Sequence, residues 1–225
     1  MKFVFAATLI ISIALNAYAD EDTNWWTEFK SAVDDYVSSI PAEAKGSMSS
    51  HMKGFVPIPI GLIQRNKRNK PAHQVLHGEF NCDGKQDYAV IGVNDTDPLA
   101  KALLSSQPLP REILKVASER YHSLTFSVPA VVWVGLSEAS GFTWKPYSGS
   151  YASIRKPFGG DLFEKAKEQL ASRAKDGGIM PEIDVRWAHE HRCEVLSIGC
   201  CEKPGMDYVW DRRSKQLIAV YLGEC

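Results

Sequence analysis

Residues 193–222 read CEVLSIGCCEKPGMDYVWDRRSKQLIAVYL, and this stretch decides the expected fold. It contains three strand-like runs, at 193–199, 206–211 and 216–222, which are separated by turn-forming residues. Short apolar runs bounded by turn residues are typical of strands that pair with their neighbours in the chain. The stretch therefore predicts a C-terminal antiparallel meander.

Upstream of the meander, the sequence predicts an N-terminal helix over 24–40. Its apolar residues fall at helical spacing, with Asn24 as a cap and Pro41 as the stop. Residues 41–54 are rich in serine and glycine, and we expect a loop there. Two prolines within 55–60 remove backbone donors, which confines that segment to a sheet edge or an extended connection.

The middle of the chain alternates between helix and strand signals. Asp97-Pro98 is typical of a capped helix start, and Pro110 of another. The run 124–136 indicates one or two buried strands, and 182–187 a further strand. Asp161 and Glu164 form a capping-box pattern for a helix that ends at Gly177-Gly178. Together these signals predict an α+β fold, an antiparallel sheet with a C-terminal meander that is packed by two or three helices.

The composition is that of a globular protein without a strong charge. Of 225 residues, 44% are hydrophobic and 24% are charged, and the formal net charge is −1. Such a balance supplies no long-range field that would draw the chain to nucleic acid or to an anionic membrane. We therefore expect no nucleic-acid partner.

The first 19 residues have the pattern of an export signal. Lys2 precedes an apolar run that reaches Leu15, and residues 17–19, AYA, give the small-x-small pattern of a cleavage site. The run is short for a membrane span, which takes about 20 apolar residues. We expect a signal peptide at 1–19 and a single domain at 20–225, periplasmic or secreted, without stable membrane insertion after cleavage.

An exported chain enters an oxidising compartment, so we interpret its cysteines first as disulfide partners rather than as metal ligands or nucleophiles. The five are Cys82, Cys193, Cys200, Cys201 and Cys225. In the predicted meander the first and third strands end at one edge, which places Cys225 near Cys200 or Cys201. Adjacent cysteines seldom bond to each other, so we expect one of those two bridges. A bridge between Cys82 and Cys193 stays open as an alternative without support of its own.

Residues 78–90, GEFNCDGKQDYAV, carry the most specific chemistry in the chain. Oxygen-bearing side chains recur at Glu79, Asn81, Asp83 and Asp87, while Lys85 can offer its carbonyl and Gly84 permits a sharp turn. Hard cations such as Ca²⁺ favour six to eight oxygen ligands that converge on one point. The flanking segments 72–77 and 88–93 predict the strands of a hairpin. Without a metal, the same residues form an Asp/Gly turn held by hydrogen bonds from the backbone to side chains.

This segment resembles the D-x-N-x-D-G-x-x-D calcium loop of FG-GAP and VCBS repeats, here in a single copy. With residues 208–211 and 220–223, it is similar to exported bacterial proteins that carry one such loop. The resemblance implies a structural calcium ion held by Glu79, Asn81, Asp83, the Lys85 carbonyl and Asp87. The chain departs from the pattern at Glu79, where Asp is usual, and at Cys82, where Gly is usual.

A rival metal site lies in Trp187-Ala188-His189-Glu190-His191-Arg192-Cys193. On a strand, His189, His191 and Cys193 would project to one face, and two imidazoles with a thiolate suit zinc or copper. The H-E-x-x-H spacing of zincins is absent, and ordinary surface histidines are the simpler interpretation.

The sequence assigns no catalytic residue, because no nucleophile is paired with a base by any recognisable motif. Our leading hypothesis is an exported non-catalytic protein in which the cation loop braces a β-hairpin and the surface binds another protein, as an inhibitor or immunity protein does. The alternative hypothesis is a metal-dependent hydrolase that uses the region of His189 and His191.

Overall fold

The structure is a computed structural model that describes residues 26–59, 75–105, 131–149, 151–155, 163–169, 185–200 and 203–220. One antiparallel sheet has the strands β1 (Phe55–Pro57), β2 (Leu76–Gly78), β3 (Asp87–Asn94), β4 (Val131–Glu138) and β5 (Gly141–Ser148). The other has β6 (Tyr151–Arg155), β7 (Val195–Cys200), β8 (Lys203–Asp211) and β9 (Gln216–Val220). The helices are 26–39, α2 (Ala42–His51), α3 (Pro98–Leu104), 163–169 and α6 (Val185–Glu190).

The two sheets share one apolar core. On β3, Ala89 and Ile91 belong to the cluster that also contains Leu196 and Ile198 of β7. Successive side chains of a strand point to opposite faces, so the intervening residue Val90 points away from this core. Val90 packs with the buried residues of the first helix and α2 instead.

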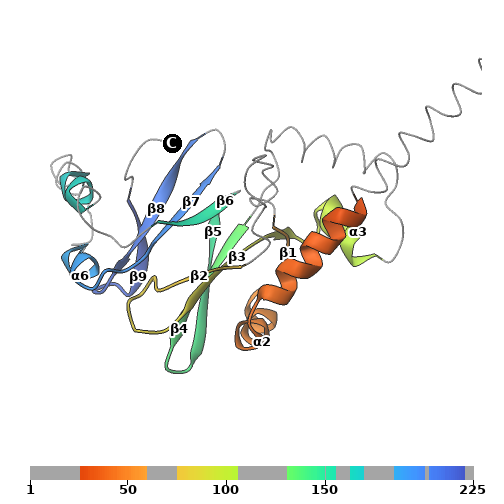
Figure 1. Cartoon of the computed structure of the whole chain (residues 1–225), viewed down its shortest axis with the longest axis horizontal. Coiled ribbons are helices and arrows are strands. Elements are labelled where there is room, and N and C mark those ends of the chain that lie inside the picture. The colour runs from red at the N-terminus through yellow and green to blue at the C-terminus, as the bar shows by residue number, and fades with distance from the viewer. Residues whose placement is uncertain are drawn as a thin grey trace, which may run out of the picture.

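The outer face of the second sheet is covered in the same way. Val195 of β7 and Val209 of β8 pack with Ala188 of α6 and Ala166 of the helix over 163–169. The layers are therefore helices, sheet, sheet and helices, and Figure 1 shows α2 and α6 at opposite ends with the sheets between them. Within the described residues, none of the helices is long and apolar enough to cross a membrane.

The α+β class and the meander are confirmed. Strands β7, β8 and β9 pair consecutively and antiparallel, and β2 pairs with β3 around the acidic loop. The Asp97 carboxylate accepts a hydrogen bond from the Leu99 N–H at 2.8 Å and caps α3 as predicted. Among the described strands, β1 pairs only with β3, which agrees with the edge position that its proline predicts.

The prediction of a loop over 41–54 was wrong, because α2 occupies residues 42–51. Pro41 ends the first helix and directly precedes the second. The helical pattern is hard to recognise among the serine and glycine residues because its apolar stripe is narrow. In this stripe, Ala44 and Met48 are four residues apart and buried. The hydroxyls of Ser49 and Ser50 donate to carbonyls three residues earlier, so their polar groups are satisfied within the helix.

The prediction of a strand over 182–187 was also wrong from residue 185 onward, where α6 begins. Strands β5 and β6 were not predicted. Several other predictions lie outside the described residues: the signal peptide at 1–19, the helix after Pro110, the cap at Asp161, and Cys201 and Cys225 with their bridges.

Candidate functional site

The predicted ligands lie in the turn between β2 and β3 and at the start of β3. Asp87 is fully buried and Asn81 is buried, whereas Asp83 and Lys85 are exposed and Glu79 is half-buried. Gly84 has the left-handed backbone, φ +81°, that the turn was expected to need. The structure thus brings the five predicted residues together in one turn but places them at very different depths.

The Asp87 carboxylate organises this turn by accepting three backbone hydrogen bonds. Its Oδ2 accepts from the N–H of Phe80 at 2.7 Å and of Asn81 at 3.0 Å. Its Oδ1 accepts from the Ser137 N–H of β4 at 2.7 Å. Burial raises the pKa of Asp87 to about 6, and the hydrogen bonds lower this pKa without cancelling the effect of burial.

The other oxygen side chains of the turn are engaged with the protein as well. Asn81 accepts from the Asp83 N–H at 3.1 Å and donates its amide to the Ser137 carbonyl at 3.0 Å. Asp83 accepts from the Lys85 N–H at 2.9 Å, and Glu79 accepts from the N–H of Gly84. Side chains of Asn and Asp that bond to the backbone two residues on are a normal way to stabilise a turn.

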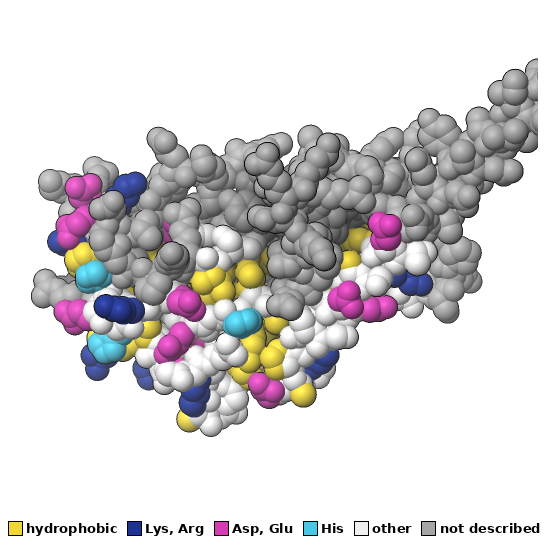
Figure 2. Space-filling model, in the orientation of Figure 1, with side chains coloured by type: hydrophobic (Ala, Val, Ile, Leu, Met, Phe, Trp, Pro, Cys, Tyr) yellow, Lys and Arg dark blue, Asp and Glu magenta, His cyan; other side chains and the backbone are white. Residues whose placement is uncertain are grey.

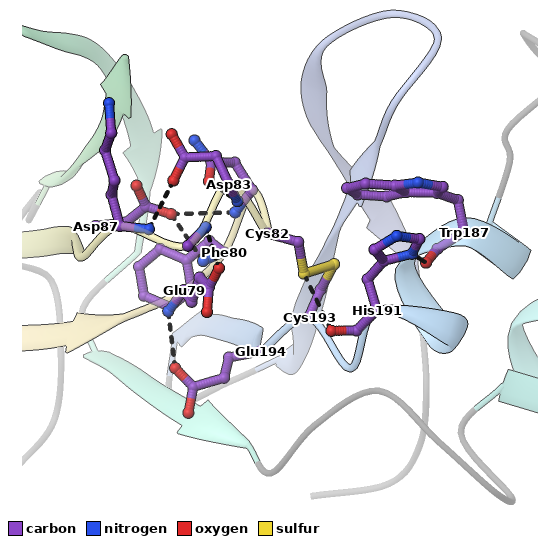
Figure 3. Close-up of a disulfide and its surroundings, with 12 residues drawn as sticks. Glu79, Phe80, Cys82, Asp83, Asp87, Trp187, His191, Cys193 and Glu194 are labelled. Atoms are coloured by element: carbon purple, nitrogen blue, oxygen red, sulfur yellow. Dashed lines mark hydrogen bonds between the residues drawn. A yellow bond between two sulfur atoms is a disulfide. The ribbon is translucent and has the colours of Figure 1, made fainter. Parts of the chain in front are cut away.

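A disulfide joins this turn to the short segment between α6 and β7. Cys82 bonds to Cys193, with an S–S distance of 1.99 Å and a Cα–Cα distance of 5.3 Å, across 111 positions of sequence (Figure 3). Next to the bridge, the Glu194 carboxylate accepts from the Glu79 N–H at 2.8 Å, and the Glu194 N–H donates to the Glu79 carbonyl at 3.1 Å. This was the cysteine pairing that the sequence left without support.

Cys82 has a left-handed backbone, φ +56°, which is uncommon for any residue other than glycine. It stands where the resembling calcium loop has glycine. At this position the side chain forms the disulfide with Cys193. That substitution was the one sequence signal that could have singled out Cys82 for a bridge.

The rival metal site does not have the strand geometry expected for it. His189 lies on α6 with its ring stacked on Phe163, centroids 4.4 Å apart, and His191 follows α6 with its ring stacked on Trp187 at 4.1 Å. The Cys193 sulfur is bonded to Cys82. The strand arrangement of these three residues was wrong because α6 and its terminal turn carry the histidines.

Among the described residues, no group of three or more His, Cys, Asp or Glu side chains is placed to hold a metal ion. The oxygen side chains of the turn accept hydrogen bonds from its own backbone N–H groups. Calcium binding by Glu79, Asn81, Asp83, Lys85 and Asp87 stays a prediction.

The chain matches no family model, no curated protein and no solved structure.

Proposed function

We propose that this chain is an exported protein that binds another protein, as an inhibitor or immunity protein does, and that its acidic turn braces the scaffold. The single observation that carries the proposal is the Cys82–Cys193 bridge, because it joins the acidic turn of one sheet to the end of α6 beside the other. The calcium ion suggested by the resemblance would add to this brace.

Export accounts for the bridge and for the pattern of the first residues together. Disulfides persist in oxidising compartments, which an exported chain reaches, and the sequence over 1–19 has the charge, apolar run and cleavage pattern of a signal. A periplasmic or secreted location follows from this proposal.

The brace has three parts. Asp87 joins the turn to β4 through the Ser137 N–H, the disulfide joins it to Cys193, and Glu194 pairs with Glu79 through both backbone and side chain. Each part connects segments that are far apart in sequence. A surface held this firmly loses little conformational freedom when a partner binds, and such preorganisation increases affinity.

Affinity capture from the exported fraction of the source organism tests the proposal. The mature chain, immobilised under oxidising conditions, should retain one protein in a near-stoichiometric amount. An unrelated disulfide-containing protein of similar size, immobilised at the same density, is the control. Recovery of no such protein would contradict the proposal. Hydrolysis of an ester or phosphate substrate by this chain, together with zinc that copurifies with it, would also contradict the proposal.

A further inference from the structure

The C-terminal end of α6 contains an arginine where glycine is usual. The Arg192 N–H donates to the His189 carbonyl at 3.1 Å, and the Cys193 N–H donates to the Ala188 carbonyl at 3.0 Å. These two hydrogen bonds form a Schellman motif, whose C′ residue adopts the left-handed conformation and is most often glycine. Here that residue is Arg192, with φ +55°.

A side chain in this conformation has an energetic cost. The Cβ atom of an L-residue crowds the following carbonyl, at about 1–2 kcal/mol. Residues held in such conformations cluster at functional sites. The arginine at this position is therefore not explained by the stability of the helix end, and its guanidinium group needs another account.

Beside Arg192, Trp187 lies between polar and cationic neighbours. Its ring stacks on the His191 ring with centroids 4.1 Å apart and an interplanar angle of 23°, and the Arg212 guanidinium lies 5.6 Å from its centroid. Trp187 is half-buried, whereas His191, Arg192 and Arg212 are exposed. We call these four residues the α6 surface.

The disulfide lies directly behind the α6 surface. Cys193 follows Arg192 in the chain, and Figure 3 shows Trp187 and His191 on the side of the bridge away from Asp83 and Asp87. The acidic turn and the α6 surface thus lie on opposite sides of the disulfide that links their segments. This places the brace next to the part of the molecule that it would hold still.

The charges of the α6 surface are unbalanced. Within the described part of the chain, no carboxylate forms an ion pair with Arg192 or with Arg212, although Glu190 of α6 is exposed two positions before Arg192. Figure 2 shows His, Lys or Arg, and Asp or Glu side chains close together at the α6 end of the molecule. A guanidinium group matches a carboxylate with two parallel hydrogen bonds, and Trp and Arg are enriched among the residues that dominate protein interfaces.

We infer that the α6 surface binds an acidic segment of the partner protein. Carboxylates of that segment pair with Arg192 and Arg212, and an apolar side chain of the segment packs on the open part of Trp187. This inference rests on the proposed function, since it names the surface and the chemistry of the partner. It also accounts for the arginine at the strained position, because a glycine there would be more stable and would not bind.

An NMR titration with a short peptide tests the surface without the natural partner. The probe alternates Asp or Glu with Leu or Phe, and the control peptide has Asn and Gln in place of the acids. The acidic peptide should shift the signals of the Trp187 indole N–H and of the amides of His191 and Arg192. No shifts up to millimolar peptide, or equal shifts with the control peptide, would overturn the inference.

Two variants and a matched control make the test specific. Arg192→Gly should leave the chain as stable as before or more so, and should weaken peptide binding about tenfold, as should Arg212→Ala. Lys45→Ala removes an exposed charge from α2 at the opposite end of the molecule and should change neither property. Unchanged affinity in Arg192→Gly and Arg212→Ala would show that these arginines do not bind the peptide.

Two further results separate this inference from the proposed function. If the wild-type chain captures a partner and the double variant R192G/R212A captures it equally well, the inference is wrong and the proposed function stands. If the wild-type chain captures nothing, the proposed function is wrong. The peptide titration alone then shows whether the α6 surface binds acidic segments. Binding of anionic lipid vesicles with no response to the acidic peptide would also overturn the inference.

Discussion

Removal of the Cys82–Cys193 bridge should destabilise the protein more than the loss of any one hydrogen bond of the acidic turn. The bridge spans 111 positions of sequence, and a loop of this length restricts the unfolded chain by about 5 kcal/mol in the chain-entropy model. Domains of this kind have a free energy of unfolding of about 5–15 kcal/mol, so the loss is a large share of the total. Cys193→Ala is the simplest variant, because Cys193 has a buried side chain and lacks the backbone strain of Cys82.

A second step separates the covalent effect from the strained backbone at Cys82. With Cys193→Ala as the shared background, Cys82→Gly and Cys82→Ala both lack the bridge and differ at one side chain. Glycine adopts φ +56° without strain, whereas alanine adopts it at a cost of about 1–2 kcal/mol, although glycine loses more freedom on folding. The net difference should favour Cys82→Gly by about 0.5–1 kcal/mol.

Urea denaturation under oxidising conditions, followed by tryptophan fluorescence, measures both differences. Under reducing conditions, which also open the bridge expected at Cys225, the wild-type chain and Cys193→Ala should have the same stability, and this comparison controls for effects of the substitution itself. A loss below about 1 kcal/mol in Cys193→Ala, or a Cys82→Ala variant as stable as Cys82→Gly, would refute the idea that this bridge holds a strained turn in place.

Three further predictions concern the turn and the first sheet. Because burial raises the pKa of Asp87 to about 6, the folded chain binds this proton more tightly than the unfolded chain. The free energy of unfolding should therefore rise by about 2–3 kcal/mol from pH 7 to pH 4 relative to Asp87→Asn, and parallel pH profiles would contradict this. A Cβ at Gly135 would lie 2.6 Å from the Trp144 ring, so Gly135→Ala should cost about 1–3 kcal/mol in urea denaturation, and a neutral result would mean that the ring moves freely. Calorimetry should show a calcium site in the millimolar range or tighter that Asp83→Asn weakens, and heats equal to buffer dilution would rule that site out.

The sequence predicted the fold best where a short-range pattern decided it. The meander and the hairpin around the acidic turn have strand-like runs between turn residues, and β7, β8, β9, β2 and β3 follow them. It failed at α2, where Ala44 and Met48 make a stripe too narrow to stand out among serines. It failed at α6, where Trp187 and His191 have the four-residue spacing of one helical turn and stack on each other, but the apolar run is too short to be told from a strand.

The candidate site was only partly predictable for a different reason. The five residues of the turn come from one contiguous segment, so their proximity was readable from the sequence. Their depth, their bonds to Ser137 and Glu194, and the bond of the neighbouring Cys82 to Cys193 depend on which segments the fold brings alongside, and these partners lie at least 50 positions away. Arg192 was missed because an arginine gives no sign in the sequence that its backbone is left-handed.

The most direct test of the account is a calorimetric titration of the oxidised mature chain with the protein recovered by affinity capture. We predict one binding site per chain, with an affinity that falls as salt screens the contacts of Arg192 and Arg212. The account would be contradicted if no binding heat were measured and the chain instead chemically modified the recovered protein.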